Sequence, residues 1–451
     1  MTVTDAAPLP HQSGVFQSGG HLNAIFANIL SRALAPVNIG PLIVLRVAFG
    51  LLMGGSMIRF MARGWIRELY VMPPFHFTYG GFDWIRPLPE AGLWVVFIAL
   101  TLLSLCIALG LAYRFSIISF FLLFTYIELL DKSYYLNHYY FVSLLSFLLI
   151  FLPLNGAYAL DNRLGVAPRR TAVPAWMVWA VRLQLGLVYC FAGLAKINPD
   201  WLLEALPLRI WLRARTGTPL IGGLFDAAWV AFGMSWAGML FDLTIPFWLS
   251  WRRSRLMAYT AVFVFHGLTG LLFNIGMFPW IMIGCTLVFF GWKTERGLPA
   301  RLLRAGSPRS GSGVVVAVLL LFFAAQLSLA FQHWLIPGDV NWTEEGGRFA
   351  WRVMLVEKTG HATFFVQDAE SGREWMVLPG DYLTQFQEQQ MVFQPDMLLQ
   401  FARFIAAQYE RPVKVRVEAY VSWNGRSSRL LLDPTVDLLG VKRPPILERE
   451  T

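Results

Sequence analysis

Charged residues are scarce in this sequence. Of its 451 residues only 14 % are Asp, Glu, Lys or Arg, whereas 56 % are hydrophobic. A soluble chain of this length needs a larger polar fraction to cover its surface, so the composition excludes a purely soluble protein. The net charge of +9 comes mostly from Lys and Arg between apolar stretches, where membrane topology and anionic lipids explain it. We therefore expect the lipid bilayer, and no nucleic acid, as a partner.

Cysteine and histidine are also rare. Cys106, Cys190 and Cys285 lie in apolar stretches without a CxxC pair, which predicts no disulfide. The seven histidines form no HxxxH or HExxH motif, so no metal site is expected. Glycine-rich phosphate loops and a GxSxG motif are absent as well, which disfavours nucleotide hydrolysis and serine hydrolase chemistry. The first residues lack a signal-peptide pattern, so the first apolar stretch is expected to direct membrane insertion uncleaved.

Long apolar stretches dominate the first three quarters of the chain. A transmembrane helix needs roughly 20 apolar residues, and the sequence predicts a polytopic α-helical membrane protein of about nine spans near 39–61, 91–111, 113–130, 138–154, 176–197, 225–250, 256–274, 277–292 and 313–333. The expected organisation is a cytoplasmic, partly disordered tail (1–36), a transmembrane helical catalytic domain (37–334) and an extramembrane β-rich α+β domain (335–451).

The loops differ between the two sides of the membrane. Lys and Arg are more frequent in one alternating set, which favours a cytoplasmic N-terminus and a periplasmic or lumenal C-terminal domain, in a bacterial plasma membrane or, in a eukaryote, the ER membrane. The other set, on the side of that domain, mixes aromatic residues, prolines and ionisable groups in the segments 72–89, 128–140, 192–212 and 273–280. An interfacial aromatic belt would enrich both faces. We therefore predict that these segments converge on one site.

The C-terminal region has the pattern of short strands. Residues 361–367 and 373–379 predict a hairpin around DAESG, and 413–423 alternates apolar and polar residues before the turn signal Asn424-Gly425. Residues 395–410 start with Pro and an acidic residue and keep an apolar face, which predicts an amphipathic helix.

A few ionisable groups fall at membrane depth, where each must be paired or line a cavity: Arg46, Glu128, Arg182, Lys196, Asp242 and His266. Lys196 ends an apolar helix, so it is either a lysine that extends to the interface or a desolvated amine able to act as a base. Spacing alone leaves both interpretations open. For His138 and His266 it favours hydrogen-bonded structural roles over catalysis.

The sequences of these segments resemble those of the vitamin K-dependent gamma-glutamyl carboxylase family. The likeness runs in order through RVAFGLLM, FTYGGFDWIRPLP, DKSYYLNHYY, VRLQLGLVYCFAGLAKINPDWL, FDLTIPF and FHGLTGLLFNIGMF, then through NWTEEGGRFAWRVML, LPGDYLTQ, PDMLLQFA and VSWNGRSSRLLLDPTVDL. It covers roughly residues 40–440 and includes both parts of the chain.

The resemblance implies an enzyme that oxygenates vitamin K hydroquinone (phylloquinone or menaquinone) to its epoxide. Coupled to this, CO₂ is added to the gamma carbon of a glutamate in a peptide or protein partner. A glutamate γ C–H is too weak an acid for Lys or His, so oxygenation with O₂ must supply a stronger base in a water-poor pocket. The reaction requires no metal.

The resemblance also implies site residues. Lys196 matches the lysine that deprotonates the hydroquinone, and Trp201 follows it in the same motif. Asn137 and His138 match an Asn-His pair whose histidine lies beside the reacting centre. His266 and the run 274–278, with Asn274, Met277 and Phe278, match a wall of the quinone pocket. Candidates to hold the substrate glutamate or its flanking peptide are Arg209, Arg426, Arg429 and Asp433.

The catalytic interpretation requires a buried, uncharged Lys196 amine beside an apolar cavity. An amine in bulk water, or paired with a carboxylate without such a cavity, would contradict it.

The sequence departs from the family pattern at three points. Thr269 stands where animal relatives carry Asn, no cysteine pair links the two parts, and the chain ends soon after DPTVDL. Two alternatives remain: a quinone epoxidase without carboxylation, and a non-catalytic membrane module for peptide export or immunity.

Overall fold

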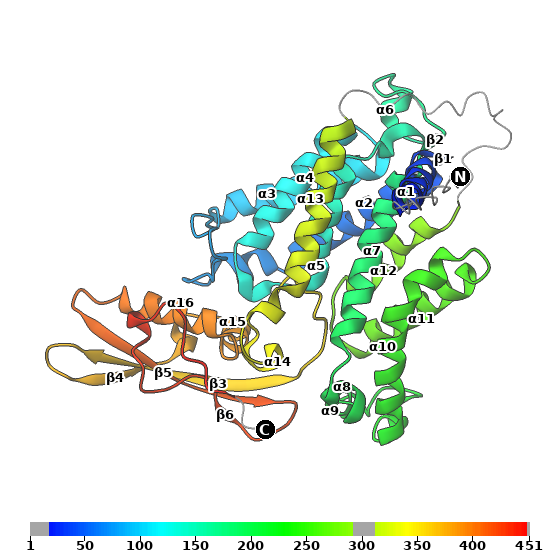
Figure 1. The fold of residues 1–451 in the computed structure, drawn as a ribbon. Helices are drawn as coiled ribbons and strands as arrows, with labels where there is room; N and C mark the ends of the chain where they lie inside the picture. The colour runs from blue at the N-terminus through cyan, green and yellow to red at the C-terminus, as the bar shows by residue number, and fades with distance from the viewer. Residues whose placement is uncertain (1–17, 292–311, 449–451) are drawn as a thin grey trace, which may run out of the picture.

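The computed structural model describes residues 18–291 and 312–448. A bundle of helices forms one part, and a β-sheet with helices on it lies at one end of the bundle (Figure 1). The mostly helical fold with a strand-containing C-terminal region agrees with the fold class predicted from the sequence.

All nine predicted apolar stretches form helices. Six of them, within the described ranges, are long and apolar enough to cross a membrane: α2 (Gly40–Ala62), α3 (Glu90–Leu109), α7 (Ala175–Ala195), α10 (Ala228–Ser250), α11 (Arg255–Leu272) and α13 (Ser312–Phe331). The other three are shorter: α4 (Tyr113–Leu129), α5 (Asn137–Ile150) and α12 (Phe278–Thr286). The predicted number of nine spans is therefore not confirmed, because continuous apolar sequence does not guarantee a continuous long helix.

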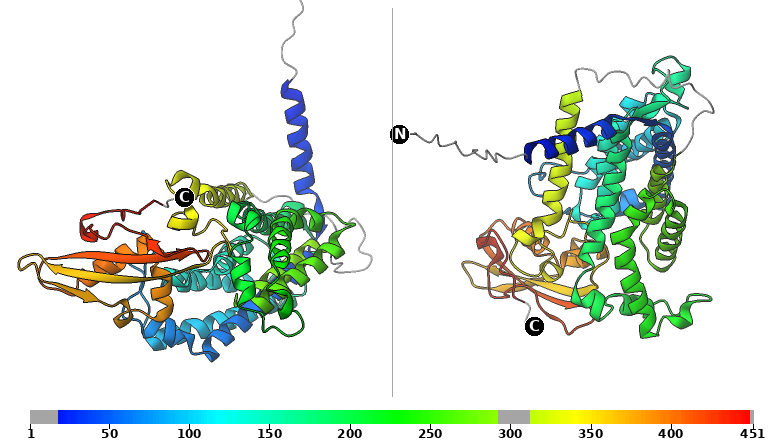
Figure 2. Two further views of the ribbon diagram at one scale, coloured as in Figure 1. Left: turned by 90° about the horizontal axis from the view of Figure 1, so that it is seen from below. Right: turned by 45° about the vertical axis from the view of Figure 1, so that its right-hand side comes forward.

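The predicted N-terminal tail contains a helix that the sequence analysis did not identify. Residues 1–17 of this tail lie outside the described residues, but Ser18–Leu34 form α1. This helix contacts α7 and lies crosswise to the other bundle helices (Figure 2). A short antiparallel ribbon, β1 (Pro36–Asn38) with β2 (Ala172–Pro174), follows it. The remaining short helices are α6 (Leu160–Arg163), α8 (Pro199–Leu203), α9 (Leu208–Arg213) and α14 (Val340–Thr343).

Two arginines inside the bundle donate hydrogen bonds to backbone carbonyls. Arg46, 1 % exposed, donates to the carbonyl oxygens of Leu154 (2.9 Å) and Tyr158 (2.6 Å). Arg182 donates to the carbonyl oxygen of Val288 at 3.1 Å. Charge at membrane depth is costly unless it is paired in this way. These arginines therefore serve to hold helices together.

The C-terminal part, which we call the outer domain, contains an antiparallel sheet of order β4-β3-β5-β6. Its strands are β3 (Lys358–Asp368), β4 (Glu374–Val377), β5 (Val413–Trp423) and β6 (Arg429–Leu430). Alternate residues of β3 and β5 point into a core that is shared with α16 (Pro395–Ala406), with α15 (Gln385–Met391) nearby. The predicted hairpin, helix and turn are confirmed, and Asn424 and Gly425 have the positive φ values, 50° and 74°, that this turn requires.

Bundle segments enter the outer domain. Phe77 is fully buried in the outer-domain core, and the amide of Gln400 on α16 bonds both the backbone N–H (3.1 Å) and C=O (3.0 Å) of Thr78. Gln387 on α15 donates to the Asp131 carboxylate at 2.8 Å. Two of the aromatic loops predicted to gather on one side thus meet the same domain.

A charge cluster strengthens this contact. The Asp396 carboxylate lies 2.5 Å from the Lys132 ammonium of the bundle and 3.0 Å from the Arg348 guanidinium. Burial alone would raise the pKa of Asp396, but the positive charges of Arg348 and Lys132 outweigh burial and hold it below its ordinary value. The carboxylate is therefore ionised in the folded protein at a lower pH than in the unfolded chain.

We expect Asp396→Asn to lower the melting temperature at neutral pH, and this difference from wild type to shrink in acid. Because the pKa of Asp396 is lower in the folded protein than in the unfolded chain, where it is about 3.9, the ionised carboxylate stabilises the fold at pH values above about 3.9. This stabilisation is lost as the pH falls through the pKa of the folded state. Melting curves of detergent-solubilised protein between pH 7 and pH 3 measure it. The exposed Asp381→Asn is the control. A difference that does not change over this range would contradict the assignment.

Candidate active site

The site is built around the end of α7. The helix stops at Lys196, and Asn198 starts the next one: its side chain accepts a hydrogen bond from the backbone N–H of Trp201 at 3.0 Å. Pro199 at the first position of α8 prevents α7 from continuing. The chain therefore folds back, and the Trp201 ring lies 5.5 Å from the Lys196 amine.

A close approach of α10 gives Lys196 its partner. A Cβ atom at Gly193 would lie 2.8 Å from the backbone nitrogen of Leu243, so only glycine allows this contact without a shift. The Lys196 Nζ then lies 2.8 Å from Asp242 Oδ2 and 3.2 Å from the carbonyl oxygen of Ala192. The side chains of Lys196 and Asp242 are only 8 % and 7 % exposed.

This geometry changes one element of the sequence interpretation. Lys196 is buried, but it is paired with the Asp242 carboxylate, whereas the sequence pattern indicates two separate ionisable groups. The pairing depends on a helix contact between residues 46 positions apart, which the sequence pattern does not reveal. A catalytic interpretation of Lys196 must therefore include Asp242.

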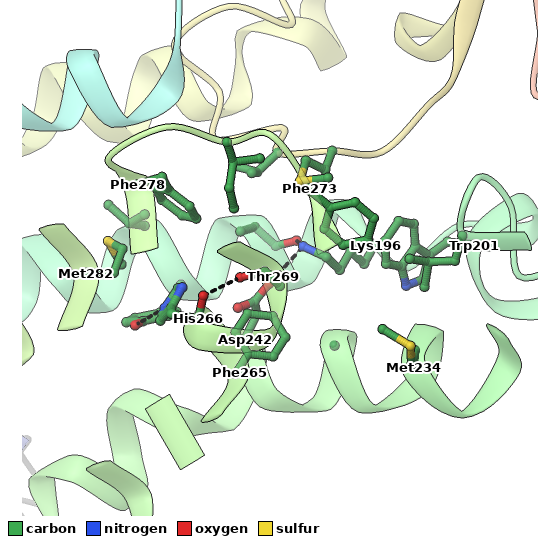
Figure 3. Close-up of a pocket in the computed structure, with 18 of the residues that line it drawn as sticks. Lys196, Trp201, Met234, Asp242, Phe265, His266, Thr269, Phe273, Phe278 and Met282 are labelled. Carbon is green, nitrogen blue, oxygen red and sulfur yellow. Dashed lines mark hydrogen bonds and ion pairs between the residues drawn. The ribbon is translucent and has the colours of Figure 1, made fainter. Parts of the chain in front are cut away.

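An apolar cavity lies beside this ion pair. Its walls come from α7, α10, α11, α12 and the α8–α9 segment, and they include Trp201, Phe265, Phe273, Phe278 and Met282. In Figure 3, Lys196 and Asp242 lie between Trp201 at one end and His266 with Phe278 at the other. Residues 353 and 354 of the outer domain complete the lining. The cavity thus lies at the junction of the two parts and combines aromatic walls with one ion pair.

His266 belongs to the wall of this cavity. Its Nε2 lies 2.8 Å from the Tyr189 hydroxyl on α7, and the Thr269 hydroxyl donates to its carbonyl oxygen at 3.0 Å. The buried Nδ1 has no partner in the described part of the chain. His266 can therefore have both the hydrogen-bonded structural role that the spacing favours and the position in the pocket wall that the resemblance implies.

His138 and Asn137 do not line the cavity, and His138 packs against Phe278 of its wall. The buried His138 ring is 5.9 Å from the ring of Phe278, which in turn is 5.5 Å from the ring of His266. His138 itself is not among the residues that line the cavity. Asn137 accepts a hydrogen bond from the Tyr135 hydroxyl at 3.2 Å. In this conformation Phe278 separates His138 from the Lys196 cavity.

Only some residues of the run 274–278 contribute to the wall of the cavity. Ile275 and Phe278 line the cavity, whereas Asn274 is exposed and Met277 packs against the bundle core. The chain turns between α11 and α12 at Gly276, with a φ of 61°, so neighbouring side chains point in different directions. Only part of this predicted wall therefore faces the cavity.

The predicted peptide-binding residues do not gather at one place. Arg426 forms a bidentate ion pair with Asp200 on α8, with both N–O distances 2.9 Å, and so joins the outer domain to the bundle. Asp433 accepts from the backbone N–H and hydroxyl of Thr435 within its own turn. Arg429 is exposed, and Arg209 is half-buried outside the cavity lining. Asp200, a partner that the sequence pattern does not reveal, accounts for the position of Arg426.

The cavity combines aromatic walls with a single ion pair. Aromatic and methionine side chains suit a fused ring, and the Lys196–Asp242 pair provides the polar group to which a hydroxyl can bond. Residues 18–291 and 312–448 contain no cluster of three or more potential metal ligands. The three cysteines are unpaired, as predicted.

Comparisons with known proteins agree with both parts of the chain. The model of the HTTM domain family matches residues 34–293, which is more than half of the chain. The model of the vitamin K-dependent gamma-carboxylase lumenal domain matches residues 312–448. No solved structure matches the chain. These two adjoining matches, in the order bundle then outer domain, show that the protein is a membrane protein belonging to the vitamin K-dependent gamma-carboxylase family.

Proposed function

We propose that the protein is a peptidyl-glutamate carboxylase that couples epoxidation of vitamin K hydroquinone to CO₂ addition at the gamma carbon of a peptide glutamate. Membership of the family supports the reaction class. The single observation that carries the proposal is the buried Lys196–Asp242 pair at an aromatic cavity. When bound, the hydroquinone together with O₂ supplies the strong base that the glutamate γ C–H requires.

Lys196 acts in this proposal as the base for the hydroquinone hydroxyl. Desolvation penalises both charges of a buried ion pair, and we take the Lys196 amine to be neutral when the hydroquinone binds. The neutral amine accepts the hydroxyl proton, and the ammonium that results balances the negative charge left on the ligand. Asp242 fixes the position of the amine through the 2.8 Å contact. Trp201 and Phe273 exclude water from this proton transfer.

The outer domain supplies the peptide side of the reaction. Its residues 353 and 354 complete the cavity, so a glutamate that approaches along this domain reaches the cavity at the junction. We place this domain in the periplasm or lumen and the N-terminus in the cytoplasm. His138 remains a proposed second catalytic residue, which requires the Phe278 ring to move. Arg209 and Arg429 remain the proposed contacts for the peptide.

The test is an assay of membranes that contain the protein. With reduced vitamin K, labelled bicarbonate and a glutamate-rich peptide, we expect label in the peptide and a comparable amount of quinone epoxide. The same peptide with each Glu replaced by Gln is the matched control and must remain unlabelled. Oxidised vitamin K in place of the reduced form must also give no label.

Two outcomes contradict the full proposal. Epoxide without label across several glutamate-rich peptides would reduce the function to quinone epoxidation. Neither epoxide nor label, from protein whose melting transition shows that it is folded, would favour the non-catalytic membrane module.

A further inference from the structure

A second cavity lies on the other side of the bundle. Its walls come from α4, α5 and α13, with loop residues Tyr79 and Phe349 at its outer end, and its volume is about 330 Å³. No residue lines both this cavity and the one at Lys196. The proposed carboxylation does not use it.

The cavity contains a carboxyl group without a counter-charge. Glu128, in the last turn of α4, has no ion pair or hydrogen bond with any residue that the structure describes, and no Lys, Arg or His lines the cavity. The buried ionisable groups Arg46, Arg182 and Asp242 all have partners. Unlike these three groups, Glu128 has no such partner among the described residues, and it lines the cavity.

Two hydroxyl groups lie in the same lining and are also unsatisfied. The Oγ1 of Thr125, one turn before Glu128, and the Oγ of Ser143 on α5 are buried without a partner in residues 18–291 and 312–448. Buried polar atoms normally find partners, because a hydrogen bond that is lost on burial and not replaced destabilises the fold. One carboxyl and two hydroxyls together provide three acceptors that a ligand can satisfy.

Aromatic rings surround the outer end, and apolar side chains line the inner end. Tyr79, Tyr135 and Tyr140 pack around Phe349 with ring centroids 5.9, 5.2 and 4.9 Å from it. Deeper in the bundle, Phe147 on α5 meets Phe322 on α13 at 5.3 Å. The cavity thus combines an acidic, aromatic region with an apolar region, which suits a polar head joined to a hydrocarbon chain.

We propose that this cavity binds a lipid-soluble primary amine, with its ammonium at Glu128 and its alkyl chain between α5 and α13. An isolated carboxylate is costly in an apolar site, and an ammonium removes this cost by pairing with it. The three N–H donors of a primary ammonium match Glu128, Thr125 and Ser143. The faces of the tyrosine rings attract the cation as well. An anionic head is disfavoured because no basic residue lines the cavity.

Binding of labelled dodecylamine to the purified full-length protein in nanodiscs tests this proposal. We expect one saturable site, at least tenfold weaker binding of dodecan-1-ol, and no saturable binding of dodecyl phosphate. Glu128→Gln keeps the shape but removes the charge, and it should weaken dodecylamine binding at least tenfold. The exposed Glu90→Gln is the matched control and should bind like wild type.

A second variant tests the proposal independently, in case Glu128→Gln does not fold. Leu144→Trp fills space in the cavity and leaves Glu128 itself in place, and it should abolish dodecylamine binding because the alkyl chain would lie there. Melting curves establish that each variant is folded. Equal binding of dodecan-1-ol and dodecylamine, or dodecylamine binding unchanged in folded Glu128→Gln, would overturn the proposal. Because the readout is binding, the result is independent of carboxylase activity.

Discussion

Replacing Lys196 with alanine is expected to lower both peptide carboxylation and quinone epoxidation by about 10² to 10⁴-fold, the range that a positioned general base contributes. Both products should fall together, because removal of the hydroquinone proton precedes both. The measurement is label incorporation and epoxide formation at saturating hydroquinone, together with the KM for the hydroquinone.

The control for this prediction is Lys414→Ala, which removes an exposed lysine from β5. It should leave both products at the wild-type level. A folded Lys196→Ala protein that retains most of its epoxidation would show that another group deprotonates the hydroquinone. An increase in KM with unchanged kcat would assign Lys196 to binding and remove it from the proton transfer.

Asp242→Asn is expected to be strongly destabilising as well as inactivating. Removing one partner of a buried ion pair leaves an uncompensated charge and typically costs about 3–5 kcal/mol. The Lys196 ammonium then lacks its carboxylate in an apolar cavity. The fall in melting temperature of the detergent-solubilised protein measures the first effect, and the carboxylation assay measures the second.

A double variant separates the two roles of the pair. Lys196→Met with Asp242→Leu replaces both charges by apolar groups, which often restores or exceeds wild-type stability. We expect a recovered melting temperature and no activity. The exposed Asp226→Asn should change neither quantity. If the double variant melts as low as Asp242→Asn, loss of packing rather than an unpaired charge explains the destabilisation.

The sequence allowed the elements to be predicted well. Apolar stretches gave the helices of the bundle, and alternation over 413–423 gave β5 with the same bounds. These features depend on local periodicity, which a sequence displays directly. The predicted number of spans is not confirmed, and α1 was not predicted, because helix length and docking depend on neighbouring elements.

The site was only partly predictable, because its key contacts are long-range. The sequence singled out Lys196 but not its pairing with Asp242, which depends on the space left by Gly193. Arg426 looked available for a substrate carboxylate, but Asp200 already holds it. In both cases the residue type and the cost of burying charge indicated that a partner was needed, whereas only the fold identified the partner.

The entry of Phe77 into the core of the outer domain has a consequence for biosynthesis. This ring and the Thr78 backbone that Gln400 holds are translated long before β3, β5 and α16. The outer sheet therefore reaches its native packing only after it has met this earlier loop of the helical part. Part of the core of the outer domain therefore comes from the bundle. An outer domain expressed alone would lack the Phe77 side chain in its core.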